Sequence, residues 1–298
     1  MKNIKRMIAN KIKNRLKNNS VVFVNGYPKV GKTAFIKELA GTYMDFDDPL
    51  TRQRILSVAF WEQSLDYPVV IDHVDHESVG FQKLTALFSH QSLPTGAVIV
   101  VMTTIGAIDE SVTLYPYTIE ERDIGSERGI HLSQLPMLDK SSMCDYVTKK
   151  TLDDYIEAIF TSSRASFCQY TQRRMRVEVK TWLQEMIDQS GVYKKEELRT
   201  WLETYATVSG TSIPLKLMRQ YCNKSLSRPT LNHYQSYLSQ QVIRPLEAMH
   251  DIGREEYQIK QPRHFMIDTL EMTLMLKLTP AKLNKYKEPK IMTKIVIY

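Results

Sequence analysis

The chain has 298 residues, of which 43% are hydrophobic, and this length is sufficient for two domains that each bury a core. Its three cysteines, Cys144, Cys168 and Cys222, show no C-x-x-C spacing, which argues against a disulfide framework and a zinc site and favours a cytoplasmic protein. No apolar run reaches the roughly 18 residues of a membrane-spanning helix, and the first residues lack the apolar segment of a secretory signal.

The net charge of +7 is unevenly distributed along the chain. Every charged side chain in residues 1–19 is Lys or Arg, acidic residues outnumber basic ones in residues 20–139, and basic residues are again in excess from residue 140 onwards. This asymmetry predicts that a polyanion would bind the N-terminal arm or the second half of the chain. An equally open alternative is that these basic side chains belong to solvated helix faces.

Residues 1–19 form a predicted basic amphipathic helix. Ile4, Ile8, Ile12 and Leu16 recur every four residues, and Lys and Arg fill the other faces. We expect the apolar stripe to pack on the core of the protein itself. Contact with an anionic membrane surface or with nucleic acid remains the alternative.

Residues 20–140 show an alternation of apolar strands and helices, which is typical of a parallel sheet in a three-layer α/β sandwich. The expected strands are Val21–Asn25, Tyr43–Phe46, Val69–Ile71, Ala97–Met102 and Val112–Tyr117. The expected helices are Lys32–Ala40, Leu50–Trp61 and Gly80–Phe88.

The segment after the first strand fits G-x-x-x-x-G-K-[ST], the P-loop or Walker A motif, at every fixed position. Its glycines permit the backbone to approach a phosphate group closely, and its N–H groups and the N-terminus of the following helix favour an anion. Lys32 can reach the β- and γ-phosphates, and the Thr33 hydroxyl can bind Mg²⁺. No Asn-Lys-x-Asp run that would select guanine follows, so we expect ATP. The predicted nucleotide-binding residues are Gly26, Tyr27, Pro28, Lys29, Val30, Gly31, Lys32, Thr33 and Ala34.

Polar residues end the third and fourth expected strands. Asp72 directly follows an apolar run, which predicts that it binds Mg²⁺ together with Thr33. The next residue, His73, and nearby Asp75 are the candidates for activating the attacking water. Thr103 at the end of the fourth strand could contact the γ-phosphate. The alternative is that His73 only ends the strand and that hydrolysis is slow or absent.

The chain becomes mostly helical after residue 140. We expect a helical linker or lid in residues 141–197, a winged-helix domain in residues 198–275 and a basic tail in residues 276–298. In the expected winged helix, the third helix, Pro229–Gln240, carries side chains that can contact bases or phosphates. DNA is therefore a possible partner, and packing of this domain as a lid is the alternative.

Several stretches together resemble the bacterial and archaeal AAA-superfamily ATPases whose P-loop module leads into a C-terminal winged helix. The stretches are Val21–Thr33, Tyr43–Pro49 (YMDFDDP), Asp72–Asp75 (DHVD), Leu114–Arg122 (LYPYTIEER) and Lys260–Asp268 (KQPRHFMID).

The resemblance implies ATP with Mg²⁺ and an arginine, supplied by another copy or by a partner protein, that completes the site. The Walker B segment departs from that group, because His73 stands where a water-polarising Glu is usual, and Glu110-Ser111 replaces a customary Gly-Arg. Arg122 and Arg128 are the available arginines. Two functions follow: a weak Mg²⁺-dependent ATPase that acts as a nucleotide switch, or a non-catalytic, ATP-liganded DNA-binding regulator.

Overall fold

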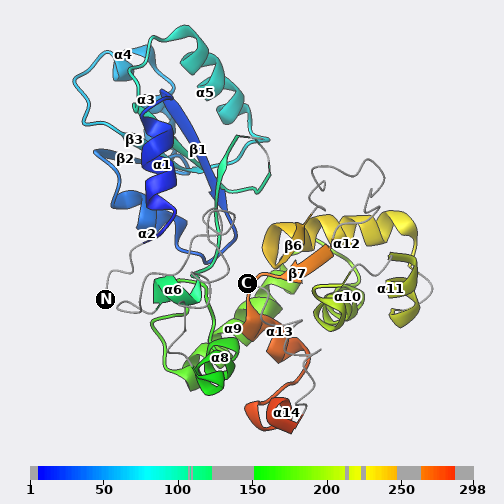
Figure 1. Cartoon of the computed structure of the whole chain (residues 1–298). Helices are drawn as coiled ribbons and strands as arrows, with labels where there is room; N and C mark the ends of the chain where they lie inside the picture. The colour runs from blue at the N-terminus through cyan, green and yellow to red at the C-terminus, as the bar shows by residue number, and fades with distance from the viewer. Residues whose placement is uncertain are drawn as a thin grey trace, which may run out of the picture.

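The computed structural model of the protein describes residues 6–106, 108, 110–122, 151–211, 215–222, 226–246 and 263–285. These residues form a sheet with its covering helices, which we call the sheet part, and a second, mainly helical part, which begins with α8 (Leu152–Ile159) and ends with α14 (Pro280–Lys285) (Figure 1). No helix among the described residues is both long and apolar enough to cross a membrane.

The sheet has five strands, all parallel, in the order β2-β3-β4-β1-β5. The strands are β1 (Val21–Gly26), β2 (Thr42–Asp45), β3 (Val69–Val74), β4 (Val98–Met102) and β5 (Val112–Leu114). Every residue of β4 is buried, as expected for a strand covered on both faces. Because β4 lies between β1 and β3, the segments that follow these three strands share one edge of the sheet.

Helices cover both faces of the sheet, which confirms the three-layer α/β sandwich. The helices are α1 (Ala9–Leu16), α2 (Lys32–Lys37), α3 (Pro49–Ile55), α4 (Val58–Trp61) and α5 (Val79–His90). On one face, Ile12 of α1 and Ile36 of α2 are buried in one apolar cluster with Val24. On the other face, Phe60 and Leu84 are buried in a second cluster.

Helix α1 packs on the protein's own core, as the stripe of apolar residues predicts. Ile12 is fully buried, and Ile8 and Leu16 contact the same cluster. The helix is shorter than the predicted residues 1–19: it begins at Ala9 and ends at Leu16, residues 6–8 are not helical, and residues 1–5 lie outside the described residues.

The second part of the chain has its own apolar core, which includes Trp201, Leu238 and Leu270. Its helices α10, α11 and α12 are followed by the antiparallel pair β6–β7. This is the element order expected for a winged helix, and both the winged-helix domain and DNA binding by it stay predictions. The remaining elements of the chain are α6 (Ile119–Arg122), α8 (Leu152–Ile159), α9 (Gln172–Asp188), α10 (Lys195–Val208), α11 (Leu215–Tyr221), α12 (Arg228–Gln241), β6 (Ile243–Leu246), β7 (Arg263–Met266), α13 (Thr269–Met275) and α14 (Pro280–Lys285).

Several predicted boundaries were wrong. The single helix expected at Leu50–Trp61 is two helices, because Ser57 is extended (φ −92°, ψ 139°) and its hydroxyl donates to the carbonyl of Arg54. Strand β5 ends at Leu114, and Tyr117 instead donates its N–H to the carbonyl of Ser163, at 2.7 Å. The domain boundary predicted at residues 140–141 lies outside the described residues, as does the part of the predicted basic tail beyond residue 285.

Candidate functional site

The P-loop connects β1 to α2, as the motif predicts. Gly31 precedes α2 with a φ of 84°, and Lys29 has a φ of 62°, so two residues of this short loop are left-handed. A Cβ atom at Gly26 would lie 2.6 Å from the carbonyl oxygen of Leu114. The neighbouring strand therefore requires a glycine here, and the loop adopts the kind of curvature that gathers N–H groups into an anion-binding nest.

The Lys32 ammonium group lies inside this loop. It donates to the carbonyl oxygens of Gly26 (2.7 Å) and Tyr27 (3.2 Å). Burial lowers the pKa of Lys32 to about 8, although the Asp72 carboxylate opposes this shift. A half-buried, cationic group is thus held against the loop and close to Asp72.

Three N–H groups of the loop are free to bind an anion. Within the described part of the chain, the N–H groups of Lys29, Val30 and Gly31 have no hydrogen-bond partner. Unpaired backbone N–H groups are costly unless water or a ligand satisfies them. Together with Lys32 they form a donor set that suits phosphate oxygens.

The other P-loop residues have different surroundings. The side chains of Tyr27 and Val30 are buried, and the Tyr27 hydroxyl donates to the carbonyl of Ile243 in β6 (3.2 Å). Thr33 is half-buried in the first turn of α2, and Ala34 is exposed. Tyr27 and Val30 therefore bring only backbone groups to the loop, whereas Thr33 can offer its hydroxyl.

Asp72 lies buried near the carboxyl end of β3, with 1% of its surface exposed. Its carboxylate accepts hydrogen bonds from the Tyr43 hydroxyl (3.0 Å) and from the N–H of His73 (2.9 Å). These bonds and the nearby Lys32 compensate for the burial of its charge.

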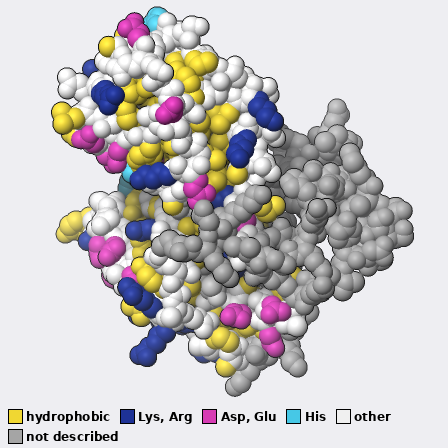
Figure 2. All heavy atoms as spheres, turned by 90° about the vertical axis from the view of Figure 1, so that its left-hand side faces the viewer, with side chains coloured by type: hydrophobic (Ala, Val, Ile, Leu, Met, Phe, Trp, Pro, Cys, Tyr) yellow, Lys and Arg dark blue, Asp and Glu magenta, His cyan; other side chains and the backbone are white. Residues whose placement is uncertain are grey.

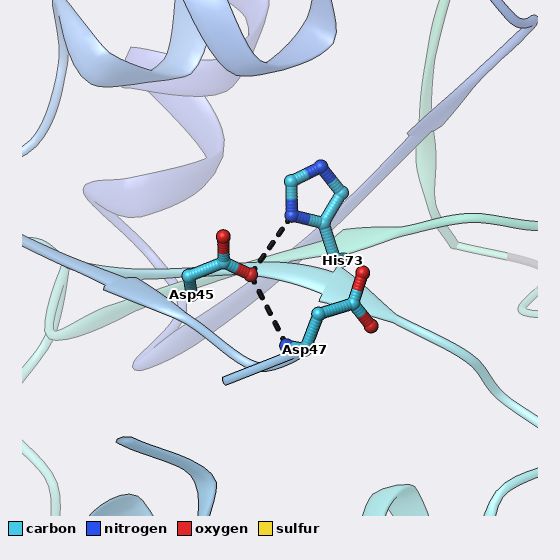
Figure 3. A group of neighbouring side chains, drawn as sticks. All are labelled: Asp45, Asp47 and His73. Atoms are coloured by element: carbon cyan, nitrogen blue, oxygen red, sulfur yellow. Dashed lines mark hydrogen bonds and ion pairs between the residues drawn. The ribbon is translucent and has the colours of Figure 1, made fainter. Parts of the chain in front are cut away.

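His73 has a φ of 60° and lies beside two aspartates of the neighbouring chain segment (Figure 3). Its Nδ1 lies 2.9 Å from Oδ1 of Asp45, and that same oxygen accepts the N–H of Asp47 at 3.1 Å. Burial lowers the pKa of His73, but the hydrogen bond to Asp45 and the charge of Asp72 outweigh it and raise the pKa above its ordinary value.

One potential ligand atom from each of Asp45, Asp47 and His73 lies within 4.8 Å of the others, so these residues could hold a metal ion. The hydrogen bonds that Asp45 accepts explain the grouping without an ion. We therefore assign no metal to these three side chains.

The remaining predicted residues lie around the same edge of the sheet. Asp75 is exposed and accepts the N–H of Glu77 (3.1 Å), so its carboxylate is engaged in the turn after β3. Thr103 is exposed directly after β4 and donates its N–H to the carbonyl of Val74 (3.0 Å). Arg122 ends α6, and Arg128 lies outside the described residues.

The sequence analysis missed the groups that hold the P-loop from outside. Arg6, Arg164 and the N–H of Ser166 donate to carbonyl oxygens of the loop. No local pattern signals these contacts, because the residues are far from the loop in sequence.

In Figure 2, the coloured side chains show Lys and Arg interspersed with Asp, Glu, hydrophobic and uncharged groups. The coloured part of this face therefore shows no extended basic surface. On α12, the third helix of the predicted winged helix, the exposed side chains include those of Arg228, Asn232 and Ser236. DNA binding through α12 therefore stays a prediction.

No protein-family model matches the sequence, and no curated protein matches it. Among solved structures, the chain is similar to the Walker-type ATPase PABY2304 of Pyrococcus abyssi, with a TM-score of 0.54 and 13% sequence identity. The alignment covers 92% of this chain and 96% of that one. The five-stranded parallel sheet and this similarity show that the chain has the fold of the P-loop NTPases.

Proposed function

We propose that this protein binds ATP with Mg²⁺ in the P-loop and acts as a nucleotide switch with weak ATPase activity. The observation that carries the proposal is the donor set of the loop, which combines N–H groups that have no partner among the described residues with the half-buried Lys32 ammonium group. Such a set compensates the charge of a triphosphate.

The oxygen ligands at the site suit Mg²⁺, which prefers hard oxygen donors. The Asp72 carboxylate, at the carboxyl end of β3, and the Thr33 hydroxyl, in the first turn of α2, are the side chains that would hold the ion, directly or through water. When bound, Mg²⁺ would neutralise charge on the phosphate oxygens.

The role of contacting the attacking water falls to His73 rather than to Asp75. Nδ1 of His73 is held by Asp45, and its Nε2 lies 4.0 Å from Oδ2 of Asp72, so the ring faces the proposed Mg²⁺ site. Asp75 is exposed in the following turn. A histidine in place of a carboxylate is consistent with slow turnover.

The similarity to a Walker-type ATPase supports the choice of ATP. The contact of Tyr27 with β6 supports the switch, because it connects the nucleotide loop directly to the helical part. A second copy or a partner protein would supply the arginine that completes the site.

Calorimetric titration of the full chain with Mg²⁺-ATP tests the proposal. We expect Lys32→Ala to weaken binding at least about 100-fold, because a charge-assisted contact with phosphate at a half-buried site is worth about 3 kcal/mol. The control Lys83→Ala changes an exposed lysine of α5 and should bind as the unchanged protein does. Failure of the unchanged protein to bind Mg²⁺-ATP, or equal binding by Lys32→Ala, would refute the proposal.

Phosphate release under saturating Mg²⁺-ATP separates the switch from the non-catalytic regulator. We expect slow release that depends on Lys32 and that falls in His73→Gln with binding retained. Intact binding without Lys32-dependent release would favour the regulator.

A further inference from the structure

We propose that Arg6 and Arg164 are positioning residues of the P-loop: they hold two of its carbonyl groups outward, so that the N–H groups of the same peptide units face the phosphates. The inference rests on the proposed nucleotide function. It adds that affinity for the nucleotide depends on the N-terminal segment and on the helical part, neither of which belongs to the P-loop motif.

Three consecutive carbonyl groups of the loop are held by donors from outside it. Arg164 donates through Nη1 to the carbonyl of Pro28, Ser166 donates its N–H to Lys29 (3.1 Å), and Arg6 donates through Nη2 to Val30.

The opposite sides of these peptide units carry the free donors. In a trans peptide the C=O and N–H bonds point in opposite directions. Outward carbonyls at Pro28, Lys29 and Val30 therefore direct the N–H groups of the next residues to the other side. These are the N–H groups of Lys29, Val30 and Gly31, which have no partner among the described residues.

Arg164 is rigidly held in the helical part, with none of its side chain exposed. Its guanidinium group pairs with both carboxylate oxygens of Glu271 in α13 and donates to the carbonyl of Gln241 (2.9 Å). Two residues earlier, the Ser162 hydroxyl donates to Asp268 (2.7 Å) at the start of α13. The segment that contacts the P-loop is thus fixed to α13 and to the end of α12.

Arg6 is held as firmly from the other side. It is 4% exposed, donates to the carbonyl of Tyr115 (3.1 Å), lies 3.4 Å from Oε2 of Glu121 and stacks over the Tyr117 ring at 3.7 Å. The Glu121 carboxylate also accepts the N–H of Met7 (2.9 Å).

The two guanidinium groups should make the N–H groups of the loop stronger hydrogen-bond donors, in addition to fixing the direction in which these N–H groups point. A carbonyl that accepts from a cation is polarised, and its peptide N–H becomes a better donor to an anion. Both arginines are desolvated in the folded protein already, so the positive charge behind the loop does not have to lose water when a phosphate arrives.

Amide proton shifts of the nucleotide-free full chain provide the first test. Replacing Arg6 in Arg6→Gln should move the Gly31 amide proton upfield, because the carbonyl of Val30 belongs to the same peptide unit. The double variant Arg164→Met/Glu271→Leu should move the Lys29 amide proton upfield, because the carbonyl of Pro28 belongs to the same peptide unit. Both partners of the buried ion pair are replaced together so that neither charge is left buried and unpaired. The Val30 amide, whose peptide carbonyl accepts from Ser166, should move least in both variants.

Titration with Mg²⁺-ATP provides the second test. Each variant should bind Mg²⁺-ATP about tenfold more weakly, with unchanged stoichiometry. A tenfold loss is what we expect when the hydrogen bonds from one peptide N–H group to the phosphates are weakened. A role limited to stability would instead lower the stoichiometry, through loss of folded protein, and leave the dissociation constant unchanged. The control Arg174→Gln removes an exposed arginine of α9, which contacts Glu178 and Tyr170, and should change neither measurement.

The inference is wrong if the folded variants bind Mg²⁺-ATP as tightly as the unchanged protein, or if the Lys29 and Gly31 amides do not move. If Arg164→Met/Glu271→Leu does not fold, Arg6→Gln decides alone. Absence of binding by the unchanged protein would contradict the nucleotide function itself, whereas the amide shifts test the two arginines without any nucleotide.

Discussion

The two sides of the candidate site are built in different ways. Around Asp72, the partners come from the sheet itself: Tyr43 and Asp45 lie on β2, which is directly paired with β3. Around the P-loop, the partners come from far along the chain, since Arg6 precedes α1, Arg164 and Ser166 follow α8, and Ile243 begins β6. One side is therefore a product of the sheet, and the other is assembled by tertiary contacts.

This difference teaches that a recognisable sequence motif does not by itself determine the conformation of its loop. The P-loop residues specify a strand, a tight turn and a helix, but a short left-handed loop needs external contacts to keep one shape. Substitutions at the two sides should accordingly affect different regions of the molecule. Those at the P-loop should disturb the contact between the sheet part and the helical part, whereas those near Asp72 should affect only their immediate surroundings.

The largest effect is expected for Gly31→Ala. A Cβ atom at this position would lie 2.7 Å from the Cβ of Ala165. The alanine backbone would also have to adopt a φ of 84°. We expect a loss of about 3 kcal/mol in the free energy of unfolding, measured in urea, from backbone strain plus overpacking.

Two further variants separate the cost of backbone strain from the cost of overpacking. Gly191→Ala also has a positive φ, of 69°, but meets nothing within 4 Å, and should cost only about 1 kcal/mol. Adding Ala165→Gly to Gly31→Ala should recover part of the loss. An equal cost at Gly31 and Gly191 would mean that the loop does not depend on the helical part.

A smaller effect is expected for Gln240→Ala, which tests how firmly the two parts are joined. The Gln240 side chain accepts the N–H of Ile105 (2.8 Å) and donates to its carbonyl (3.1 Å). Loss of both bonds should cost about 2 kcal/mol in urea unfolding. The control Gln63→Ala removes exposed bonds within the sheet part and should cost less than about 0.5 kcal/mol. Similar values for the two variants would show that this junction contributes little.

The smallest effect is expected for Tyr43→Phe, on the side of Asp72. It removes the hydroxyl that donates to Asp72, and we expect a loss of about 1 kcal/mol in urea unfolding. Tyr237→Phe removes a comparable bond, to the carbonyl of Met186 (2.6 Å) in the helical part, and should cost a similar amount. Only Tyr43→Phe should change the Mg²⁺ concentration needed for half-maximal ATP binding. The same change in both variants would contradict a local role for Tyr43.

The sequence analysis predicted most of the strands and helices because apolar periodicity is a local signal. It was least accurate where an irregular segment depends on distant partners, as at Ser57, where one expected helix is two, and at Tyr117, whose N–H bonds to Ser163 rather than to the sheet. The grouping of Asp45 with His73 follows from strand register, which a single sequence does not specify.

The sequence by itself determined the parallel sheet, the position of the P-loop and the placement of Asp72 near the carboxyl end of a buried strand, because short-range patterns encode all three; only the strand's end was wrong, since β3 continues past the predicted Ile71 to Val74. Only the tertiary structure decided which groups support the loop. Arg6 and Arg164 lie on segments without a distinctive motif, and their guanidinium groups reach the carbonyls of Val30 and Pro28 only after the N-terminal segment and α13 have packed. A hydrogen bond over such a sequence distance depends on the whole fold and leaves no local pattern to read.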